Sequence, residues 1–159
     1  MKKKTEQLLV YIIQHYDDNG IPITSLMKLV YLVDLVSIKK TGKQLSNFEY
    51  KRYKYGPFDK RIYEHIKNLL GEEIIKEDAA FSRGGDEYII YLSNKEKSFE
   101  FNKLSAEEKS IIDEVIESLQ GYGTKALVEL TYKTKPMKKI GATTENNKGL
   151  NEKLDLHIS

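Results

Sequence analysis

Few residues of this chain have the type and spacing that catalysis or metal binding needs. Its 159 residues include three His and no Cys, so cysteine nucleophiles, thiolate zinc sites and disulfides are all excluded. His15, His65 and His157 lie in no metal-ligand spacing, and the chain has neither a glycine-rich phosphate loop nor a nucleophile elbow. We therefore expect neither a metal ion nor a cofactor.

One pair of side chains leaves an enzymatic alternative open. Arg61 and His65 are four residues apart in a segment with helical periodicity, so they would share one face of a helix. Such a pair can in principle transfer protons on RNA. No second catalytic group accompanies it, so the sequence favours a protein that is not an enzyme, with His65 at the boundary of the core.

Residues suited to binding are concentrated between Phe48 and Tyr63. This stretch of sixteen residues holds six aromatic side chains and five Lys or Arg. Tyr and Arg are enriched at protein–protein hot spots, whereas basic residues between aromatics also suit nucleic acid. Alternating aromatics can equally fill the core beneath a strand. The pattern leaves all three interpretations open.

The charges fall into blocks, although the net charge is only +2. Residues 39–67 carry a net +6, residues 71–119 a net −7 and residues 125–148 a net +4. Opposed blocks can steer a charged partner, or they can face each other within the fold. The +6 block contains the aromatic stretch, so the strongest binding candidate is also basic.

Hydrophobic periodicity predicts the elements that must position these residues. We expect helices over residues 5–17, 25–40, 58–70, 105–119 and 124–131, and an antiparallel hairpin of strands 74–76 and 87–92. Pro57 suits the first position of the third helix, and Ser105 with Glu108 forms a capping box. The predicted fold class is α+β, mostly α, with about five helices around a buried central helix and a small antiparallel β-hairpin.

The central helix contains one acidic residue at a position that is expected to be buried. Residues 25–40 are apolar on almost every side, which is typical of a helix inside the core. Asp34 interrupts this pattern, so we expect it to pair with an Arg, a Tyr or a backbone amide, or to have a raised pKa. A functional site residue is the alternative interpretation of Asp34.

Several motifs occur in the order found in a known family. Residues 25–34 resemble the family's Leu-x-Lys-Leu-Leu-Tyr helix, residues 41–45 its Thr-Gly-Lys turn, and residues 53–58 its Lys-Tyr-Gly-Pro motif, and blocks at 105–109 and 127–131 follow. Over residues 5–137 the chain resembles the Panacea, or SocA-like, domain of bacterial and phage antitoxins. Tyr132 and Met137 stand where the family tends to have His and Trp.

The resemblance implies an antitoxin of a toxin–antitoxin or prophage locus. It implies a protein toxin encoded nearby as the partner and, as in one branch of the family, delivery of that toxin to an ATP-dependent protease. We expect the partner to contact the following residues: Tyr53, Lys54, Tyr55, Arg61, Lys67 and, more weakly, Tyr132. Gly56 and Pro57 would hold the turn, and Asp34 would anchor this segment from the core.

The resemblance also suggests a domain boundary. We expect a domain over residues 1–140 and a weakly ordered tail over 141–159, in which Leu150, Leu154, Leu156 and Ile158 are the residues that could dock. No apolar run reaches the length of a membrane span, so a cytoplasmic protein with no membrane partner is expected. The alternative function is a winged-helix DNA-binding regulator, with helix 58–70 in the major groove.

Overall fold

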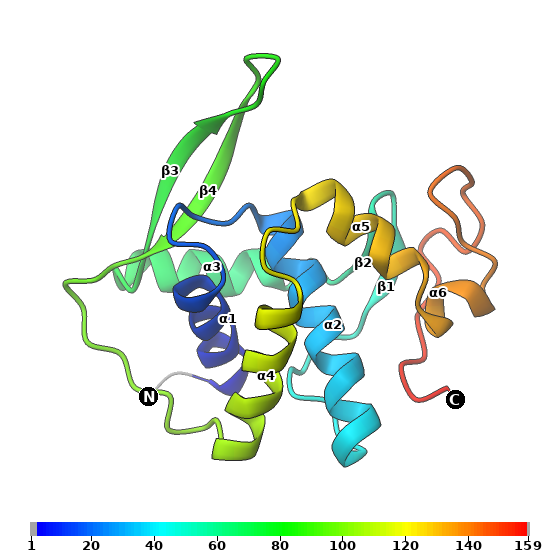
Figure 1. The fold of residues 1–159 in the computed structure, drawn as a ribbon, viewed down its shortest axis with the longest axis horizontal. Helices are drawn as coiled ribbons and strands as arrows, with labels where there is room; N and C mark the ends of the chain where they lie inside the picture. Colours follow the sequence, from blue (N-terminus) through cyan, green and yellow to red (C-terminus); the bar gives the residue numbers. More distant parts are fainter. Residues whose placement is uncertain (1–2, 159) are drawn as a thin grey trace.

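The structure, a computed structural model, describes residues 3–158. In this part of the chain there are six helices and two antiparallel hairpins (Figure 1). In chain order these are α1 (Lys4–His15), α2 (Ile23–Thr41), β1 (Lys51–Tyr53), β2 (Gly56–Phe58), α3 (Ile62–Gly71), β3 (Ile75–Phe81), β4 (Glu87–Ser93), α4 (Ala106–Ser118), α5 (Thr124–Tyr132) and α6 (Lys135–Lys139). The predicted α+β, mostly α class is confirmed, with a second hairpin and the short α6 in addition.

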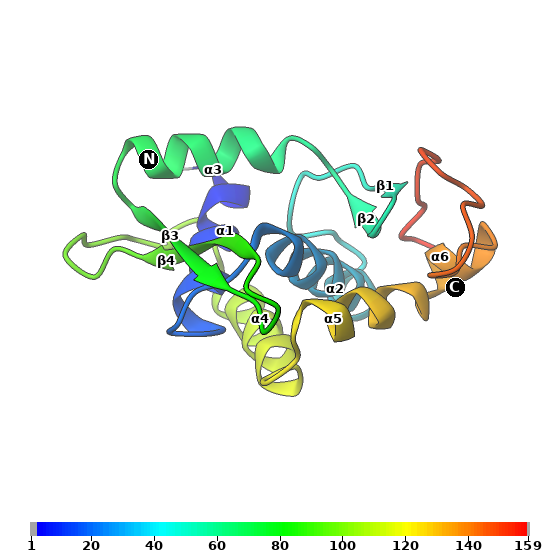
Figure 2. The same cartoon turned by 90° about the horizontal axis from the view of Figure 1, so that it is seen from above.

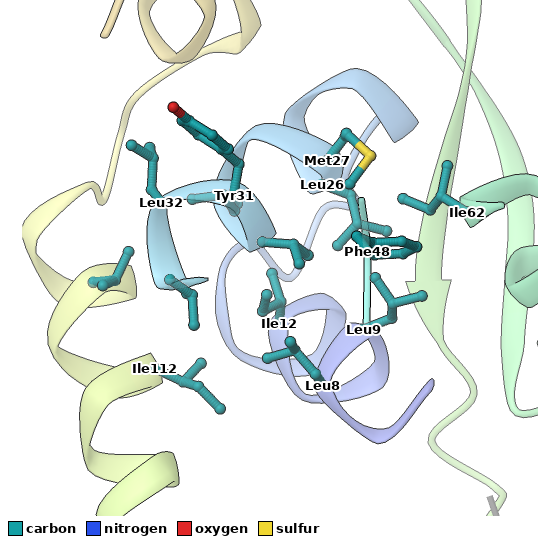
Figure 3. Packing of buried hydrophobic residues seen from close by; sticks show 14 of the residues in the cluster. Leu8, Leu9, Ile12, Leu26, Met27, Tyr31, Leu32, Phe48, Ile62 and Ile112 are labelled. Atoms are coloured by element: carbon teal, nitrogen blue, oxygen red, sulfur yellow. The ribbon is translucent and has the colours of Figure 1, made fainter. Parts of the chain in front are cut away.

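Helix α2 forms the centre of the molecule. Leu26, Leu29 and Val33 have no exposed surface, because α1 packs against one side of α2 while α4 and α5 pack against the other. Figure 3 shows Leu8 and Ile12 of the neighbouring α1 in the same cluster. Over residues 25–34 the apolar circumference therefore corresponds to a helix covered by other elements all around, whereas residues 39–41 at its end are exposed.

The segment before α3 differs from the prediction. Residues 56–58 form β2 instead of the start of a helix, and α3 begins at Ile62. Pro57 thus lies opposite Arg52 in a two-stranded hairpin, where an edge strand tolerates its missing N–H. Asp59 keeps α3 from beginning earlier in the chain, because its carboxylate accepts a 2.9 Å hydrogen bond from the Arg61 amide.

The hairpin of β3 and β4 extends well beyond the short strand predicted at 74–76. Its strands pair residue for residue from Ile75 with Ser93 to Phe81 with Glu87. Ile75 and Tyr91 are buried at its base, whereas the rest of the hairpin stands away from the helices (Figure 1). The core therefore holds one end of the hairpin and leaves its outer half exposed.

The ends of the helices follow local rules. Ser105 accepts from the Glu108 amide while the Glu108 side chain accepts from the Ser105 amide, so the predicted capping box of α4 is confirmed. Gly42, at a φ of +79°, ends α2. None of the described helices is long and apolar enough to cross a membrane.

The C-terminal segment lies against β1 (Figure 2). Lys153 forms an antiparallel bridge with Lys51, and the Leu154 amide donates to the Tyr50 carbonyl at 2.9 Å. Leu154 and Leu156 are buried, while Leu150 is 47% exposed and Ile158 is partly exposed. Two of the four apolar residues that could dock are therefore part of the core cluster.

Candidate partner-binding site

The turn between β1 and β2 presents Lys54 and Tyr55 to solvent. Gly56 makes this turn possible with a φ of +108°, which L side chains rarely adopt. A Cβ at Gly56 would lie 3.1 Å from Thr131 Oγ1 and 3.4 Å from Lys28 Cε. The turn is therefore seated directly on α5 and α2, which fixes where its two exposed side chains point.

A buried lysine holds the other side of this turn. Lys28 is 1% exposed, and its Nζ donates a 2.9 Å hydrogen bond to the Pro57 carbonyl. The same Nζ lies 5.4 Å from the centre of the Phe58 ring, a cation–π distance. Burial lowers the pKa of Lys28 to about 7. Two motifs of the sequence, the Lys of α2 and the Gly-Pro of β2, thus form one contact.

Arg52 and Tyr132 support the turn from below, and both are buried. The Tyr132 hydroxyl donates to the Lys54 carbonyl at 3.3 Å and accepts from Arg52 Nη2 at 3.2 Å. Arg52 also donates to the carbonyls of Thr143, Asn146 and Lys148 at 2.7–2.9 Å. Tyr132, expected as a weaker contact residue, is 7% exposed and so positions the turn instead of presenting a surface.

Arg61 is paired with a carboxylate of its own segment. Its Nε and Nη2 donate to Asp59 Oδ2 at 2.9 and 2.6 Å, and Nη2 also donates to the Asn47 carbonyl at 2.8 Å. Burial would raise the pKa of Asp59, but the hydrogen bonds from Arg61 and from the Glu49 amide outweigh it and hold the pKa below its usual value. The Arg61 charge is therefore largely neutralised.

Asp34 lies beneath the same region and is fully buried. Its Oδ1 accepts from the amides of Leu45 and Ser46 at 3.0 and 2.9 Å. Its Oδ2 accepts from the Ser46 and Tyr50 hydroxyls at 2.6 and 2.7 Å. Burial raises the pKa of Asp34 to about 6, against the opposing effect of these hydrogen bonds. Asp34 thus fixes the loop leading into β1, one segment earlier than the expected Tyr53–Lys67.

We group six side chains of this region as the aromatic–basic patch. They are the half-buried Tyr53 and the exposed Lys54, Tyr55, Arg61, Tyr63 and Lys67. Tyr55 and Tyr63 are 61% and 56% exposed, and Tyr63 and Lys67 are one helical turn apart on α3. The Phe58 ring bridges the patch, with its centre 5.6 Å from that of Tyr53 and 5.7 Å from that of Tyr63.

Tyr63 is exposed but was not among the contact residues expected from the sequence. In α3, Ile62 and Ile66 face the core, and Tyr63 lies outside this apolar stripe. A helix over residues 58–70 has the same phase as one that begins at Ile62, so the helical periodicity alone places Tyr63 on the outer face.

Arg61 and His65, the pair considered for acid–base chemistry, each contact a different acidic residue. His65 is 8% exposed, and its Nδ1 lies 2.8 Å from Glu6 Oε2, whereas Arg61 is bound to Asp59. Among residues 3–158, no three or more His, Cys, Asp or Glu are grouped in a way that could hold a metal ion. Arg61 and His65 therefore serve two different structural contacts.

The features behind the DNA-binding alternative are also changed by the fold. Lys60 and Arg61 precede α3 instead of lying on it, and Arg61 is neutralised by Asp59. Of the three cations that the expected recognition helix 58–70 would direct outward, Lys60, Arg61 and Lys67, only Lys67 lies within α3, where it is exposed. A helix with one outward cation provides little of the phosphate attraction that groove binding needs.

The comparisons with known proteins identify the family of this fold. The family model described as "Antitoxin SocA-like, Panacea domain" matches residues 26–137, more than half of the chain. The match includes Lys28, Asp34 and the Gly56–Pro57 turn, and it ends before the segment that contacts Arg52. No curated protein and no solved structure matches the chain. The chain therefore belongs to the SocA-like Panacea antitoxin domain family.

Proposed function

We propose that this protein is an antitoxin that binds a protein toxin directly through the aromatic–basic patch. The observation that carries this proposal is the way the patch is built. Tyr55 and Lys54 are solvent-exposed, yet the turn that bears them is held by α2 and α5 at Lys28 and Tyr132. A rigid turn with exposed aromatic and cationic ends loses little conformational entropy on binding.

The composition of the patch suits a protein surface. Large aromatic side chains are typical of hot spots, because they bury much area with few rotatable bonds. Lys54 lies 5.5 Å from the Tyr55 ring centre, and Lys67 follows Tyr63 along α3. With Arg61 paired to Asp59, the free positive charge comes from the lysines, so the surface on the toxin is expected to be acidic at its edge.

Co-expression in bacteria tests the proposal. The product of the neighbouring gene should stop growth alone, and this chain should restore growth when both are produced in the cytoplasm. Tyr55→Ala combined with Lys54→Glu should abolish the rescue, because it removes an exposed ring and reverses a charge. The matched control is Phe81→Ala with Lys95→Glu, both at exposed positions outside the patch.

The same experiment separates two ways of neutralisation. If the toxin is only blocked, its half-life in cells should be unchanged or longer when this chain is present. If it is delivered to an ATP-dependent protease, its half-life should shorten, and deletion of that protease should abolish the rescue. A neighbouring product that is not toxic, or a patch variant that rescues like the wild type, contradicts the proposal.

A further inference from the structure

A groove separates the outer hairpin from the helices. It has a volume of about 580 Å³ and is lined by Tyr16, Asp17, Pro22, Tyr88, Ile90 and Tyr122 among others. One wall is the hairpin, and the other is formed by the α1–α2 turn and the start of α5. Tyr88 and Tyr122 are 42% and 41% exposed. This groove is formed by other elements than the aromatic–basic patch.

The alternation of the strands decides which hairpin residues face the groove. In an antiparallel pair, opposed residues share a face and successive residues alternate. Tyr88 opposes Ala80, and Ile90 opposes Asp78, so these side chains lie on the groove side. Ile90 contacts Gly20 at the floor, where a Cβ would be only 2.8 Å from Ile90 Cδ1. The groove wall is therefore an aliphatic and aromatic sheet face.

The outer edge of β4 carries backbone groups that continue an existing bridge. Ile21 and Tyr91 exchange two backbone hydrogen bonds of 2.9 and 3.0 Å. Pro22 follows with no N–H, and the chain enters α2 at Ile23, so this pairing ends after one bridge. By alternation, the N–H and C=O of Ile89 point to the same edge as those of Tyr91. The edge beyond the bridge is available to a further strand.

The charges around the groove are negative. Among its lining residues Asp17 is the one charged side chain, and Asp78 lies on the same hairpin face. Lys76, at the base of this face, is opposed to Leu92 and far from the tip. The hairpin belongs to the block of residues 71–119, whose net charge is −7. The opposite face of the hairpin, which Ile89 shares, carries Glu77 and Glu87. An extended segment with apolar side chains toward the groove and alternate Lys or Arg side chains toward these carboxylates would complement this surface.

We infer that the edge of β4 and the adjoining groove bind an extended segment of a protein partner, in which apolar residues alternate with Lys or Arg. The backbone of that segment pairs with Ile89, its apolar side chains enter between Tyr88 and Tyr122, and its basic side chains lie on the opposite face of the sheet, toward Glu87. This is strand addition, in which main-chain bonds provide affinity and pockets select side chains. The inference rests on the proposed function only in taking the partner to be a protein.

A second copy of the chain fits this surface less well. Strand β4 has the sequence Glu-Tyr-Ile-Ile-Tyr-Leu-Ser, with no Lys or Arg. A copy paired along β4 would therefore bring no cation to Glu87. It would bring a second Glu87 instead, so a basic partner segment is the occupant that the charges favour.

Binding of short peptides to the purified full chain tests the inference. The probe is a fluorescein-labelled heptapeptide amide of alternating Lys and Val, with Lys at both ends, measured by fluorescence anisotropy. It should bind and shift the amide resonances of Tyr88, Ile89 and Tyr122 in ¹⁵N-labelled protein. A Glu–Val peptide of the same length should bind about tenfold more weakly or worse.

Two pairs of variants separate the edge from the groove. Ile89→Pro removes the outward N–H, whereas Ile89→Ala keeps this N–H. The affinity for the Lys–Val peptide should therefore be about tenfold lower for Ile89→Pro than for Ile89→Ala. Tyr88→Ser, on the groove side, should weaken it about fivefold or more, whereas Phe81→Ser, on the opposite hairpin face, should not. Circular dichroism of each variant verifies that it is folded.

Several results would overturn the inference. These are no binding of the Lys–Val peptide, equal binding of the Glu–Val peptide, equal affinities of the two Ile89 variants, or resonance shifts in the aromatic–basic patch instead. A concentration-dependent dimer that Ile89→Pro disrupts would assign the edge to a second copy and would also overturn it. Because these assays need no toxin, their failure is distinct from a failure of growth rescue through Tyr55 and Lys54.

Discussion

The ammonium of Lys28 donates a hydrogen bond of 2.9 Å to the backbone carbonyl of Pro57. No salt bridge to Lys28 is formed within residues 3–158, so a cation without a paired anion lies in the core beneath the β1–β2 turn. Desolvation disfavours its charged form, which is why its pKa falls to about 7. The geometry of the exposed turn thus depends on a titratable group inside the fold.

Lys28 makes the stability of the protein depend on pH above neutrality. In the unfolded chain Lys28 stays protonated to about pH 10, whereas in the folded protein it releases its proton near pH 7. The unfolded state therefore binds more protons between pH 7 and 9, and the free energy of unfolding should rise with pH by at most about 1.4 kcal/mol per unit. Lys28→Met should flatten this rise in urea unfolding, while Lys95→Met, at an exposed position, should leave it unchanged. Equal slopes for Lys28→Met and the wild type would refute this explanation.

Asp34 gives the opposite pH dependence at lower pH. Its pKa is raised to about 6 in the folded protein, so between about pH 4 and 6 the folded state binds the additional proton. The contribution of Asp34 to stability should therefore decrease as the pH rises through this interval. Asp34→Asn should remove the effect, which is visible as a changing stability difference between wild type and variant in urea unfolding at pH 4 to 6.

The different hydrogen-bond partners of the two Asp34 oxygens indicate which substitutions of Asp34 the fold tolerates. Oδ1 accepts only from backbone amides and Oδ2 only from hydroxyls. An Asn can accept at the first position and donate to the hydroxyls at the second, so Asp34→Asn should cost about 1 kcal/mol or less at pH 7. Asp34→Leu leaves the amides of Leu45 and Ser46 unpaired and should cost about 3 kcal/mol or more. Similar costs for both variants in urea unfolding would contradict this assignment.

Substitution of Gly56 by Ala should reduce stability more than the same substitution at Gly85, which also has a positive φ. Gly56→Ala has to adopt a φ of +108° and meets Thr131 Oγ1 at 3.1 Å, so we expect a loss of about 2 to 4 kcal/mol in stability. Gly85→Ala has a φ of +87° with no atom within 4 Å and should lose only about 1 kcal/mol. Thermal unfolding of both variants measures the difference, which reports the close seating of the turn on α5. Equal losses would show that this contact adds no strain.

The contacts of Arg52 lead us to expect that a chain ending at residue 140 is less stable than the full chain. Its guanidinium donates to three carbonyls between Thr143 and Lys148, and a truncation leaves this buried cation without them. Removing residues 141–159 should therefore cost about 3 kcal/mol or more. Arg52→Met should destabilise the full chain but stabilise the truncated one, because in the latter it removes an unpaired charge. If Arg52→Met has the same effect in both chains, Arg52 and this segment are not coupled.

Local features of the sequence were sufficient to predict much of the fold. The apolar circumference of α2 indicated a buried helix, and the Ser105–Glu108 spacing indicated where α4 begins. Both depend on residues within a turn or two of each other. The hydrogen-bond partners of Asp34, a Tyr and backbone amides, were also of the types expected, since a buried carboxylate needs donors.

The candidate site was less accessible to sequence reasoning. Arg52 and Arg61 look alike in the basic stretch, yet Arg52 is buried against residues 143–148 whereas Arg61 is half exposed and paired with Asp59. The predicted helix start at Pro57 was wrong, because the hairpin with β1 competes for the same residues. In each case a contact made by the fold outweighed a local preference.

By itself, the sequence determined the class of the fold, the order of most of its elements, the buried α2 and the family of the domain. These properties follow from periodicity, capping and motif order, all of which are local or additive along the chain. Only the tertiary structure decided which cations are free, that Tyr132 supports the turn from within, and that the C-terminal segment completes the shell around Arg52. The last two outcomes depend on groups about 80 to 100 positions apart, and a linear pattern carries no information on which of them meet.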